Sequence, residues 1–404
     1  MTEQNPFKVF SIDELEPGMY VVAVHKQKGN LEIKTQGWVR TLAVIAQLKK
    51  KGVLEVTVDL TKTLNDAAKT PAEAASPPVS ADSTKKREKV RFEQELGQAN
   101  VLYQQAKSLQ KKAFADIKAG RELNLSLFQD CATGFIDSVF RNQDALLCIS
   151  RIREKDAYLL EHSVNVSILM TIFAKQLGFD EALIQQLATG ALLHDMGKIK
   201  VPDAILNKPG KLTAEEFAEM RRHVVYSKEI LEQIPGLSPI SLDVAAVHHE
   251  RLDGKGYPLG LSEQQISVYG RMISIVDTYD AITAQRCYKE GQTGISALKI
   301  LKRETPHSYD PVLLAQFIKA IGIHPVGTLV KLTSQKLGIV TKSNEEDPLR
   351  PVLKVFYNCK FKRYIEVAVL DLASNRVDDE IEGAVMPEDF GIDLMRFFRQ
   401  SVLQ

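Results

Sequence analysis

Three patterns of hydrophobic and polar residues follow one another along the chain. Near its start, residues 19–24 (MYVVAV) and 53–60 (VLEVTVDL) have the character of strands, and Leu54, Val56 and Val58 alternate onto one face. Between them, residues 38–52 have a helical pattern that ends at Gly52. These patterns predict a small N-terminal α+β domain over residues 1–66.

A change of composition separates this domain from a long helical region. Residues 70–87 are rich in Ala, Pro and Ser and contain no large apolar residue, which predicts a flexible linker over residues 67–87. From about residue 88 to 322, apolar positions recur with helical spacing and strand-like alternation is scarce. We therefore expect a helical connector over residues 88–149 and a helical domain over residues 150–322.

The pattern changes again from residue 325. Short apolar runs separated by polar turns lie at 326–334, 337–343, 351–357 and 365–372, and residues 387–402 contain an amphipathic helical pattern. They predict a β-rich C-terminal extension with a terminal helix over residues 323–404. The expected fold class is mainly α: a helical bundle with a small N-terminal α+β domain and a short β-rich extension.

Composition excludes some classes of protein. The 404 residues are 44% hydrophobic and 25% charged with a formal net charge of +1, so nothing favours binding to DNA or RNA polymers. No run of about 18 apolar residues and no secretory leader is visible. Four scattered cysteines without CxxC spacing predict reduced thiols, and we expect a cytoplasmic protein without a membrane span.

The chemistry of the chain concentrates in its histidines. Five of the eight lie between residues 162 and 249, each in or at the end of an apolar helical segment. One such histidine is most often a core residue with a hydrogen-bond partner, but several in one bundle, together with aspartates, are typical of a site for Fe, Mn, Ni or Zn. The candidate ligands number more than one tetrahedral ion needs, which indicates two ions. They are His162, His194, Asp195, His223, His248, His249 and Asp277.

Two further features lie beside these candidates. Lys198, three residues after Asp195, could pair with a phosphate oxygen, because two neighbouring ions commonly serve in-line attack on phosphorus. A solvated lysine after a helix end explains Lys198 equally well. The segment HHERLDGKGYP at 248–258 has turn-forming glycines and Tyr257, and it is either an ordinary loop between helices or a loop that contacts substrate.

These motifs resemble those of a known family. HDMGK at 194–198 matches the HD signature, and residues 248–258 match the much more specific HHExxDGxGYP signature. The chain therefore resembles the HD-GYP family, bacterial phosphodiesterases of cyclic dinucleotides, over roughly residues 150–322. Residues 10–21 (FSIDELEPGMYV) resemble the domain of unknown function that often precedes it.

The resemblance implies an HD-type helical fold and hydrolysis of cyclic di-GMP to pGpG, GMP or both. It implies that the seven candidate ligands hold two divalent ions, most often Fe or Mn, with Asp195 bridging the ions and Asp280 supporting a ligand. It gives Lys198 a contact with phosphate in catalysis. It places Tyr257, Arg286 and Lys289 against the substrate.

Departures from the family pattern leave alternatives open. Tyr158 stands where some members have a glutamate that helps to hold a third ion, so we expect two ions. Val224, Ser227 and Cys287 replace common proline, glycine and proline residues, which leaves substrate preference and loop shape open. Alternatives are a preference for cyclic GMP-AMP, a catalytically silent sensor, and a hydrolase of nucleoside phosphates. A homodimer or a signalling partner protein also remains open.

Overall fold

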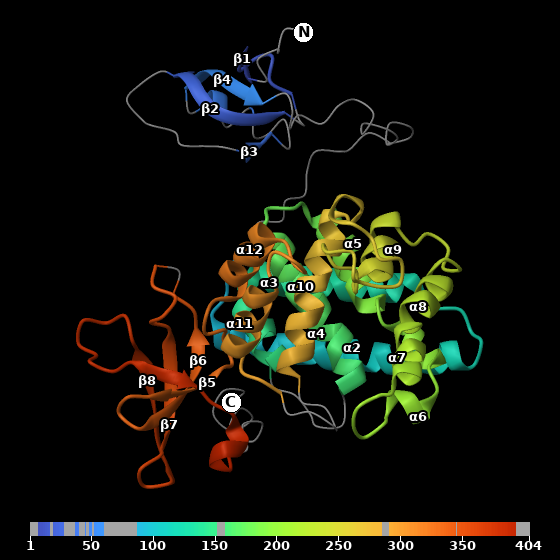
Figure 1. Ribbon diagram of the computed structural model, residues 1–404. Coiled ribbons are helices and arrows are strands. Elements are labelled where there is room, and N and C mark those ends of the chain that lie inside the picture. Colours follow the sequence, from blue (N-terminus) through green and yellow to red (C-terminus); the bar gives the residue numbers. More distant parts are fainter. Residues whose placement is uncertain are drawn as a thin grey trace. The chain divides into compact units, whose positions relative to one another are not determined.

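The structure is a computed structural model that forms two compact units, residues 1–85 and 86–404, connected by the chain (Figure 1). It describes residues 7–16, 19–27, 37–39, 45, 48–50, 52–59, 87–151, 158–284, 291–344 and 346–392. The expected linker at 67–87 lies, except for Arg87, outside the described residues. No helix among the described residues combines the length and the apolar character that crossing a membrane requires.

The first unit contains an antiparallel sheet with the strand order β1-β4-β2-β3. Alternation in β4 points Val56 and Val58 into a small core, where both are fully buried with Val21 and Val39 close by in the same cluster. Of the expected helix at 38–52, residues 45 and 48–50 are described, and they are helical. The strands are β1 (Phe7–Ser11), β2 (Tyr20–Gln27), β3 (Gly37–Trp38) and β4 (Val53–Asp59).

The second unit is a helical bundle (Figure 1) in which most of α4 and the C-terminal half of α5 are buried. In α5 the buried run from Leu187 to Leu193 is apolar apart from Thr189, which is typical of a helical segment enclosed by others. α4 contacts α2, α3, α5, α10 and α12, and Phe173 of α4 packs against Phe317 of α12 with ring centroids 5.4 Å apart. The larger helices are α2 (Phe92–Lys118), α3 (Leu125–Arg151), α4 (Tyr158–Gln176), α5 (Glu181–Leu193), α9 (Pro239–Val247), α10 (Val268–Thr283), α11 (Gly294–Glu304) and α12 (Pro311–Ile321).

Shorter helices complete the bundle, and one of them differs from the sequence expectation. The helical pattern around His223 is divided at Arg222 into two helices, at the point where the carbonyl of Met220 accepts a hydrogen bond from the His223 ring. His223 is thereby the first residue of its helix. The short helices are η2 (Met196–Lys200), α6 (Asp203–Leu206), α7 (Ala214–Arg221), α8 (His223–Leu231) and η3 (Glu263–Gln265).

The C-terminal extension is an antiparallel sheet packed on the bundle, with the order β8-β7-β6-β5-β9. β6 contacts α3, and Gly327 approaches Cys148 so closely that a Cβ would lie 3.2 Å from the Cys148 Cα. The strands are β5 (Leu329–Leu332), β6 (Lys336–Lys342), β7 (Val352–Asn358), β8 (Arg363–Asp371) and β9 (Ile381–Ala384). In the region of the expected terminal helix, residues Pro387–Phe390 form the short 3-10 helix η4, which ends at the left-handed Gly391. Residues 393–404 lie outside the described part of the chain, so the terminal helix stays a prediction. The mainly helical fold class is confirmed.

Candidate metal centre

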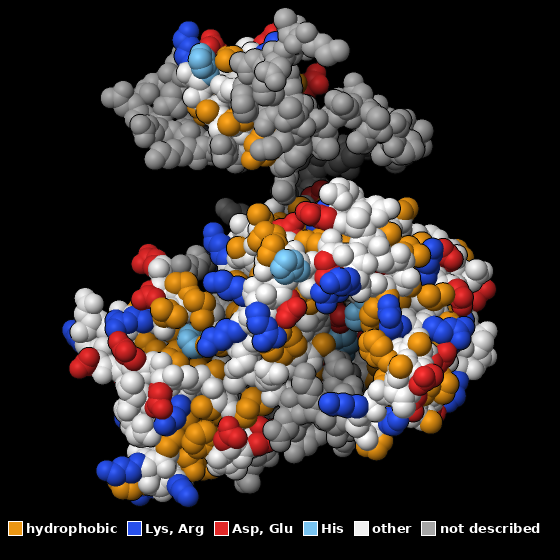
Figure 2. Space-filling model, in the orientation of Figure 1, with side chains coloured by type: hydrophobic (Ala, Val, Ile, Leu, Met, Phe, Trp, Pro, Cys, Tyr) orange, Lys and Arg blue, Asp and Glu red, His pale blue; other side chains and the backbone are white. Residues whose placement is uncertain are grey.

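All seven predicted ligands come together at one place in the bundle. His162 lies on α4, Asp277 on α10, and His223 begins α8. The other four follow helix ends: His194 and Asp195 come directly after α5, and His248 and His249 directly after α9. Figure 2 shows histidine side chains in a hollow on the surface of this unit. Helix ends therefore converge on the cluster from several directions.

Asp195 lies at the centre of the cluster and presents its two oxygens to different histidines. Its Oδ2 is 3.4 Å from His162 Nε2 and 3.3 Å from His194 Nε2. Its Oδ1 is 3.4 Å from His223 Nε2 and 3.9 Å from His248 Nε2. One carboxylate thus separates two sets of imidazole nitrogens, as a ligand shared between two ions would.

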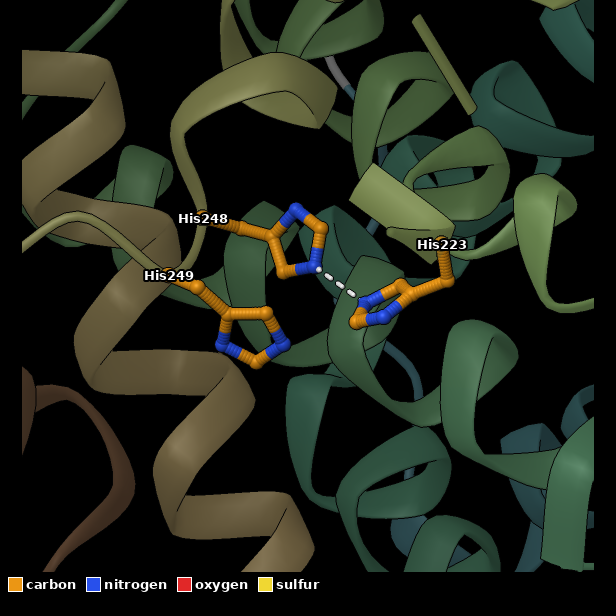
Figure 3. Close-up of side chains that lie close together, drawn as sticks. All are labelled: His223, His248 and His249. Carbon is orange, nitrogen blue, oxygen red and sulfur yellow. Dashed lines mark hydrogen bonds between the residues drawn. The ribbon is translucent and has the colours of Figure 1, made fainter. Parts of the chain in front are cut away.

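Asp277 and His249 complete the two sets. Asp277 Oδ1 lies 2.9 Å from His162 Nε2, and Asp277 Oδ2 lies 3.6 Å from His249 Nδ1. On the other side His223, His248 and His249 point toward one another, with 3.4 Å between the Nε2 atoms of His223 and His248 (Figure 3). Among the described residues, donor atoms within 4.8 Å of one another form three groups: His162, His194 and Asp277; His223, His248 and His249; and His194, Asp195 and His248, which joins the other two.

The orientation of most rings is fixed by hydrogen bonds on the far side from the cluster. The Nδ1 atoms of His194, His223 and His248 lie 2.6–2.7 Å from carbonyl oxygens three residues earlier, at Ala191, Met220 and Ala245. His162 Nδ1 lies 2.8 Å from Asp280 Oδ2. Because a carbonyl can only accept, the three carbonyl-bound rings carry hydrogen on Nδ1, which leaves Nε2 turned toward the cluster for an ion.

Burial and charge set the protonation of the cluster. Burial lowers the pKa of His223 to about 4 and that of His249 to about 3, and it also lowers the pKa of His248. Burial alone would raise the pKa of Asp195, but Lys198 and His194 hold it well below its usual range. Neutral imidazoles and ionised carboxylates are the forms that bind a cation.

His194 is the exception among these rings. Burial lowers the pKa of His194, but the adjacent Asp195 and Asp277 carboxylates more than offset burial and raise it to about 10. A proton on Nε2 of this ring must leave when that atom binds an ion, so binding would release it.

The residues fit a bound divalent metal. His194 Nε2 and Asp195 Oδ1 are buried atoms without a hydrogen-bond partner, although buried polar atoms are nearly always satisfied. Both atoms face other ligand atoms across the cluster. Six of the seven side chains are fully or almost fully buried, and His249 is half-buried. A set of imidazole nitrogens and carboxylate oxygens suits Fe, Mn, Ni or Zn, whereas Ca²⁺ prefers a site made only of oxygen atoms.

Lys198 and Tyr257 lie where the sequence expectation puts them, beside the cluster. Lys198 Nζ donates to Asp195 Oδ2, and its side chain is only 14% exposed, so it is not the freely solvated lysine of the alternative explanation. The Tyr257 ring packs on His249 with centroids 4.6 Å apart. The Arg221 guanidinium lies 4.5 Å from the Tyr257 ring centroid, which adds a cation that the sequence analysis missed.

A buried glutamate organises the loop that carries Tyr257. Glu250 is 2% exposed, and its carboxylate accepts hydrogen bonds from the backbone N–H groups of Leu259 (2.7 Å) and Leu261 (2.9 Å). A Cβ at Gly256 would collide with the backbone of Glu250 and Arg251, so glycine is needed there. Glu250 is the third residue of the HHExxDGxGYP signature, and its place directly after two predicted ligands was the signal in the sequence that could have identified it.

One departure from the family pattern has a structural explanation. Ser227 replaces the usual glycine, and its hydroxyl accepts a 2.8 Å hydrogen bond from the N–H of Gly197. A Cβ at Gly197 would collide with the backbone of His223 and Ser227, so η2 and α8 are in close contact. Ser227 therefore ties the segment after Asp195 to the helix that begins with His223.

Some predicted site residues lie outside the described part of the chain. They are Arg286 and Lys289, which lie in residues 285–290, between the end of α10 and Gly291. For Tyr158, the first residue of α4, the backbone is described and the side chain is not. The substrate contacts proposed for Arg286 and Lys289 stay predictions.

Known families and proteins resemble the chain over most of its length. The HD domain family matches residues 147–313, and a domain of unknown function, DUF3391, matches residues 8–127. A cyclic di-GMP phosphodiesterase of Pseudomonas aeruginosa is 37% identical over 84% of this chain and 82% of that protein. A cyclic di-GMP phosphodiesterase of Thermotoga maritima is 33% identical over 53% of this chain and 55% of its own length.

A relative with a different printed substrate is also similar. The 3′3′-cGAMP-specific phosphodiesterase 3 of Vibrio cholerae is 36% identical over 42% of this chain and 37% of that protein. The similarity to the Pseudomonas protein, by contrast, extends over four fifths of both chains. The chain therefore belongs to the HD-GYP family of cyclic dinucleotide phosphodiesterases and is a phosphoric diester hydrolase built on an HD domain.

Proposed function

We propose that the protein is a metal-dependent phosphodiesterase that hydrolyses cyclic di-GMP to pGpG, GMP or both, and so lowers second-messenger signalling. The observation that carries this proposal is the position of Asp195, whose two oxygens face separate sets of histidine nitrogens at 3.3–3.9 Å. The cyclic di-GMP phosphodiesterase with 37% identity supports the choice of substrate.

We propose two divalent ions, Fe or Mn in the first place, as the cofactor. His162, His194 and Asp277 would hold one ion, and His223, His248 and His249 the other, with Asp195 shared between them. When bound, such a pair supplies a water of lowered pKa and neutralises charge on the phosphate. The chain itself fixes the rings through their Nδ1 atoms, so the donor atoms need little rearrangement.

The remaining residues would act on the substrate. Lys198, held beside Asp195, would pair with a non-bridging oxygen of the reacting phosphate as charge develops there. Tyr257 and its loop would border the substrate next to His249, while Arg286 and Lys289 would bind its outer part. The Arg286→Ala variant should then have a higher KM but an unchanged metal content. The reason is that Arg286 would bind the substrate equally in the ground state and in the transition state, so its loss weakens binding without slowing the chemical step.

Two alternatives are separated by the same experiment. A preference for cyclic GMP-AMP is supported by the relative from Vibrio cholerae, and a silent sensor would bind a dinucleotide without cleaving it. The intact ligand set and the buried Lys198–Asp195 pair favour an enzyme over a sensor, because such groups are costly to bury without a role. Cytoplasmic location and a homodimer or partner protein stay predictions.

The test is turnover of both dinucleotides by protein of known metal content. The full chain is purified without oxygen, its metals are quantified, and cyclic di-GMP and cyclic GMP-AMP are supplied separately with products separated by chromatography. We expect about two ions per chain and a higher kcat/KM for cyclic di-GMP. Metal-loaded protein that cleaves neither dinucleotide would overturn the proposal, and faster cleavage of cyclic GMP-AMP would reassign the substrate. Asp195→Ala is the inactive control.

A further inference from the structure

A buried polar stripe runs along α2, a helix that the sequence analysis treated as a connector. Tyr103, Lys107 and Gln110 follow one another at helical spacings of four and three residues, so they share one face. All three are buried among apolar neighbours such as Ala106 and Ala113. The helix lies within the stretch matched by the domain of unknown function, residues 8–127, and before the HD domain match, which begins at residue 147.

Two residues of the stripe contact α4 on either side of the ligand His162. Lys107 Nζ lies 2.9 Å from Glu161 Oε1, and their side chains are 11% and 2% exposed. Tyr103 Oη donates a 2.9 Å hydrogen bond to Asn165 Oδ1. Glu161 directly precedes His162, and Asn165 follows it by three residues, so α2 holds α4 at the position of this ligand.

The third residue contacts the helix end that carries the next ligands. Gln110 Nε2 donates a 2.7 Å hydrogen bond to the carbonyl of Leu192, in the last turn of α5 and two residues before His194. Carbonyls in the last turn of a helix lack partners within the helix, and an unsatisfied buried carbonyl is costly. α2 also contacts η2, which follows Asp195.

Stability alone gives a weak reason for this stripe. A buried ion pair contributes little net stability relative to apolar side chains of similar volume, because both charges must be desolvated. What the stripe does fix is the position of α4 and α5 at the ligands, and groups that orient metal ligands strongly affect the affinity for the ion.

A second polar cluster on α2 provides a comparison within the same helix. Glu95, 1% exposed, accepts hydrogen bonds from Arg141 and Ser138 of α3 at 2.7–2.8 Å. Glu95 is buried and Arg141 is partly buried, and the pair also joins α2 to the bundle, but α3 carries none of the proposed ligands. The Glu95–Arg141 pair is therefore an ion pair between helices like Lys107–Glu161, but it does not lie next to a proposed metal ligand.

We propose that α2 is a positioning element of the metal centre, with Lys107 and Gln110 as positioning residues that act through Glu161–His162 and Leu192–His194. The inference rests on the proposed metal centre. It gives the stretch matched by the domain of unknown function a role: its last long helix completes the catalytic core.

The test measures metal affinity in the full chain rather than activity alone. Cobalt(II) is titrated into metal-free protein and followed by its visible absorption, for wild type, Gln110→Leu, the double variant Lys107→Met/Glu161→Leu, and the control Glu95→Gln. The double variant removes both charges of this pair together, so that neither Lys107 nor Glu161 is left facing an apolar replacement of the other. We expect cobalt affinity about 10- to 100-fold weaker in Gln110→Leu and in the double variant, with an altered absorption spectrum, and unchanged affinity in the control.

The outcomes separate this inference from the proposed function. Wild type that binds no cobalt would refute the metal centre itself. Wild-type affinity and spectrum in the folded Gln110 and Lys107 variants would overturn the positioning role and leave the metal centre intact. An equal loss in Glu95→Gln would also overturn it, because the effect would then reflect stability alone. Thermal unfolding of the metal-free forms shows which variants are folded. If only one of Gln110→Leu and Lys107→Met/Glu161→Leu folds, its cobalt affinity alone decides whether α2 positions the ligands.

Discussion

Glu250→Gln tests how the loop that carries Tyr257 is held beside the ligands. In the wild type both carboxylate oxygens accept hydrogen bonds, from Leu259 N–H at 2.7 Å and Leu261 N–H at 2.9 Å. A glutamine has the same shape but only one oxygen, so its amide nitrogen must face one of these N–H groups. The variant therefore loses one bond to a charged acceptor and places two donors against each other in a buried site.

The size of the effect follows from the bond that is lost. A hydrogen bond to a charged group contributes about 1.5–3 kcal/mol, and the residue is 2% exposed, so water does not easily replace it. At about 1.36 kcal/mol for each factor of ten, local opening of the loop should become roughly 10- to 150-fold more frequent. The ligands His248 and His249 precede the loop, so metal content should stay near that of wild type.

Hydrogen exchange of the full chain measures this opening directly. Amides of Leu259 and Leu261 should lose protection by that factor in Glu250→Gln, and KM should rise because Tyr257 is less well placed. Glu263→Gln is the matched control, since this first residue of η3 is 54% exposed and its carboxylate lies 3.7 Å from the Arg271 guanidinium, beyond hydrogen-bond distance. Unchanged protection at Leu259 and Leu261 would refute the reasoning, and so would equal loss in the control.

Three other changes have defined outcomes. Asp195→Ala should lose both ions and hydrolysis together, as measured by metal analysis and turnover, and a variant with normal metal content and rate would contradict a shared ligand. Lys198→Ala should lower kcat by about 10²-fold with little change in KM, whereas Lys200→Ala, two residues on and exposed, should not. Burial raises the pKa of Asp144 from 3.8 to about 6 although Ser343 donates hydrogen bonds to it, so the folded state keeps a proton that the unfolded state loses. Wild type should therefore lose about 2 kcal/mol of stability relative to Asp144→Asn as pH rises from about 4 to 6; urea unfolding that shows a constant difference would exclude this.

The clustering of the five histidines and two aspartates was predictable because so many of these side chains seldom occur together in apolar helices without a shared role. His194 and Asp195 at the end of the buried run of α5 and the pair His248–His249 after α9 are costly to bury alone. Their order along the chain, together with the long signature at 248–258, was sufficient to bring all seven residues to one place. The coarse division into α+β, helical and β-rich regions followed from periodicity.

What could not be predicted depends on contacts between distant segments. Nothing local reveals that the two oxygens of Asp195 face different histidines, because this depends on how the ends of several helices meet. The polar stripe on α2 resembles ordinary surface residues until Glu161 and Leu192 are seen opposite it. β9 was missed because its four residues include a glycine and a glutamate, and its pairing with β5 defines it.

The carbonyl partners of the ligand rings determine which substitutions the centre tolerates during evolution. His194, His223 and His248 are each oriented by a main-chain oxygen three residues earlier, which every amino acid possesses. Substitution of Ala191, Met220 or Ala245 therefore leaves the orientation of the rings unchanged, provided that the backbone carbonyl keeps its position. His162 depends instead on the side chain of Asp280, so a substitution there removes the orienting group itself. Ring orientation should accordingly resist substitution at Asp280, whereas at the other three positions it leaves packing as the limit on the side chain, most severely at the fully buried Ala191 and Ala245.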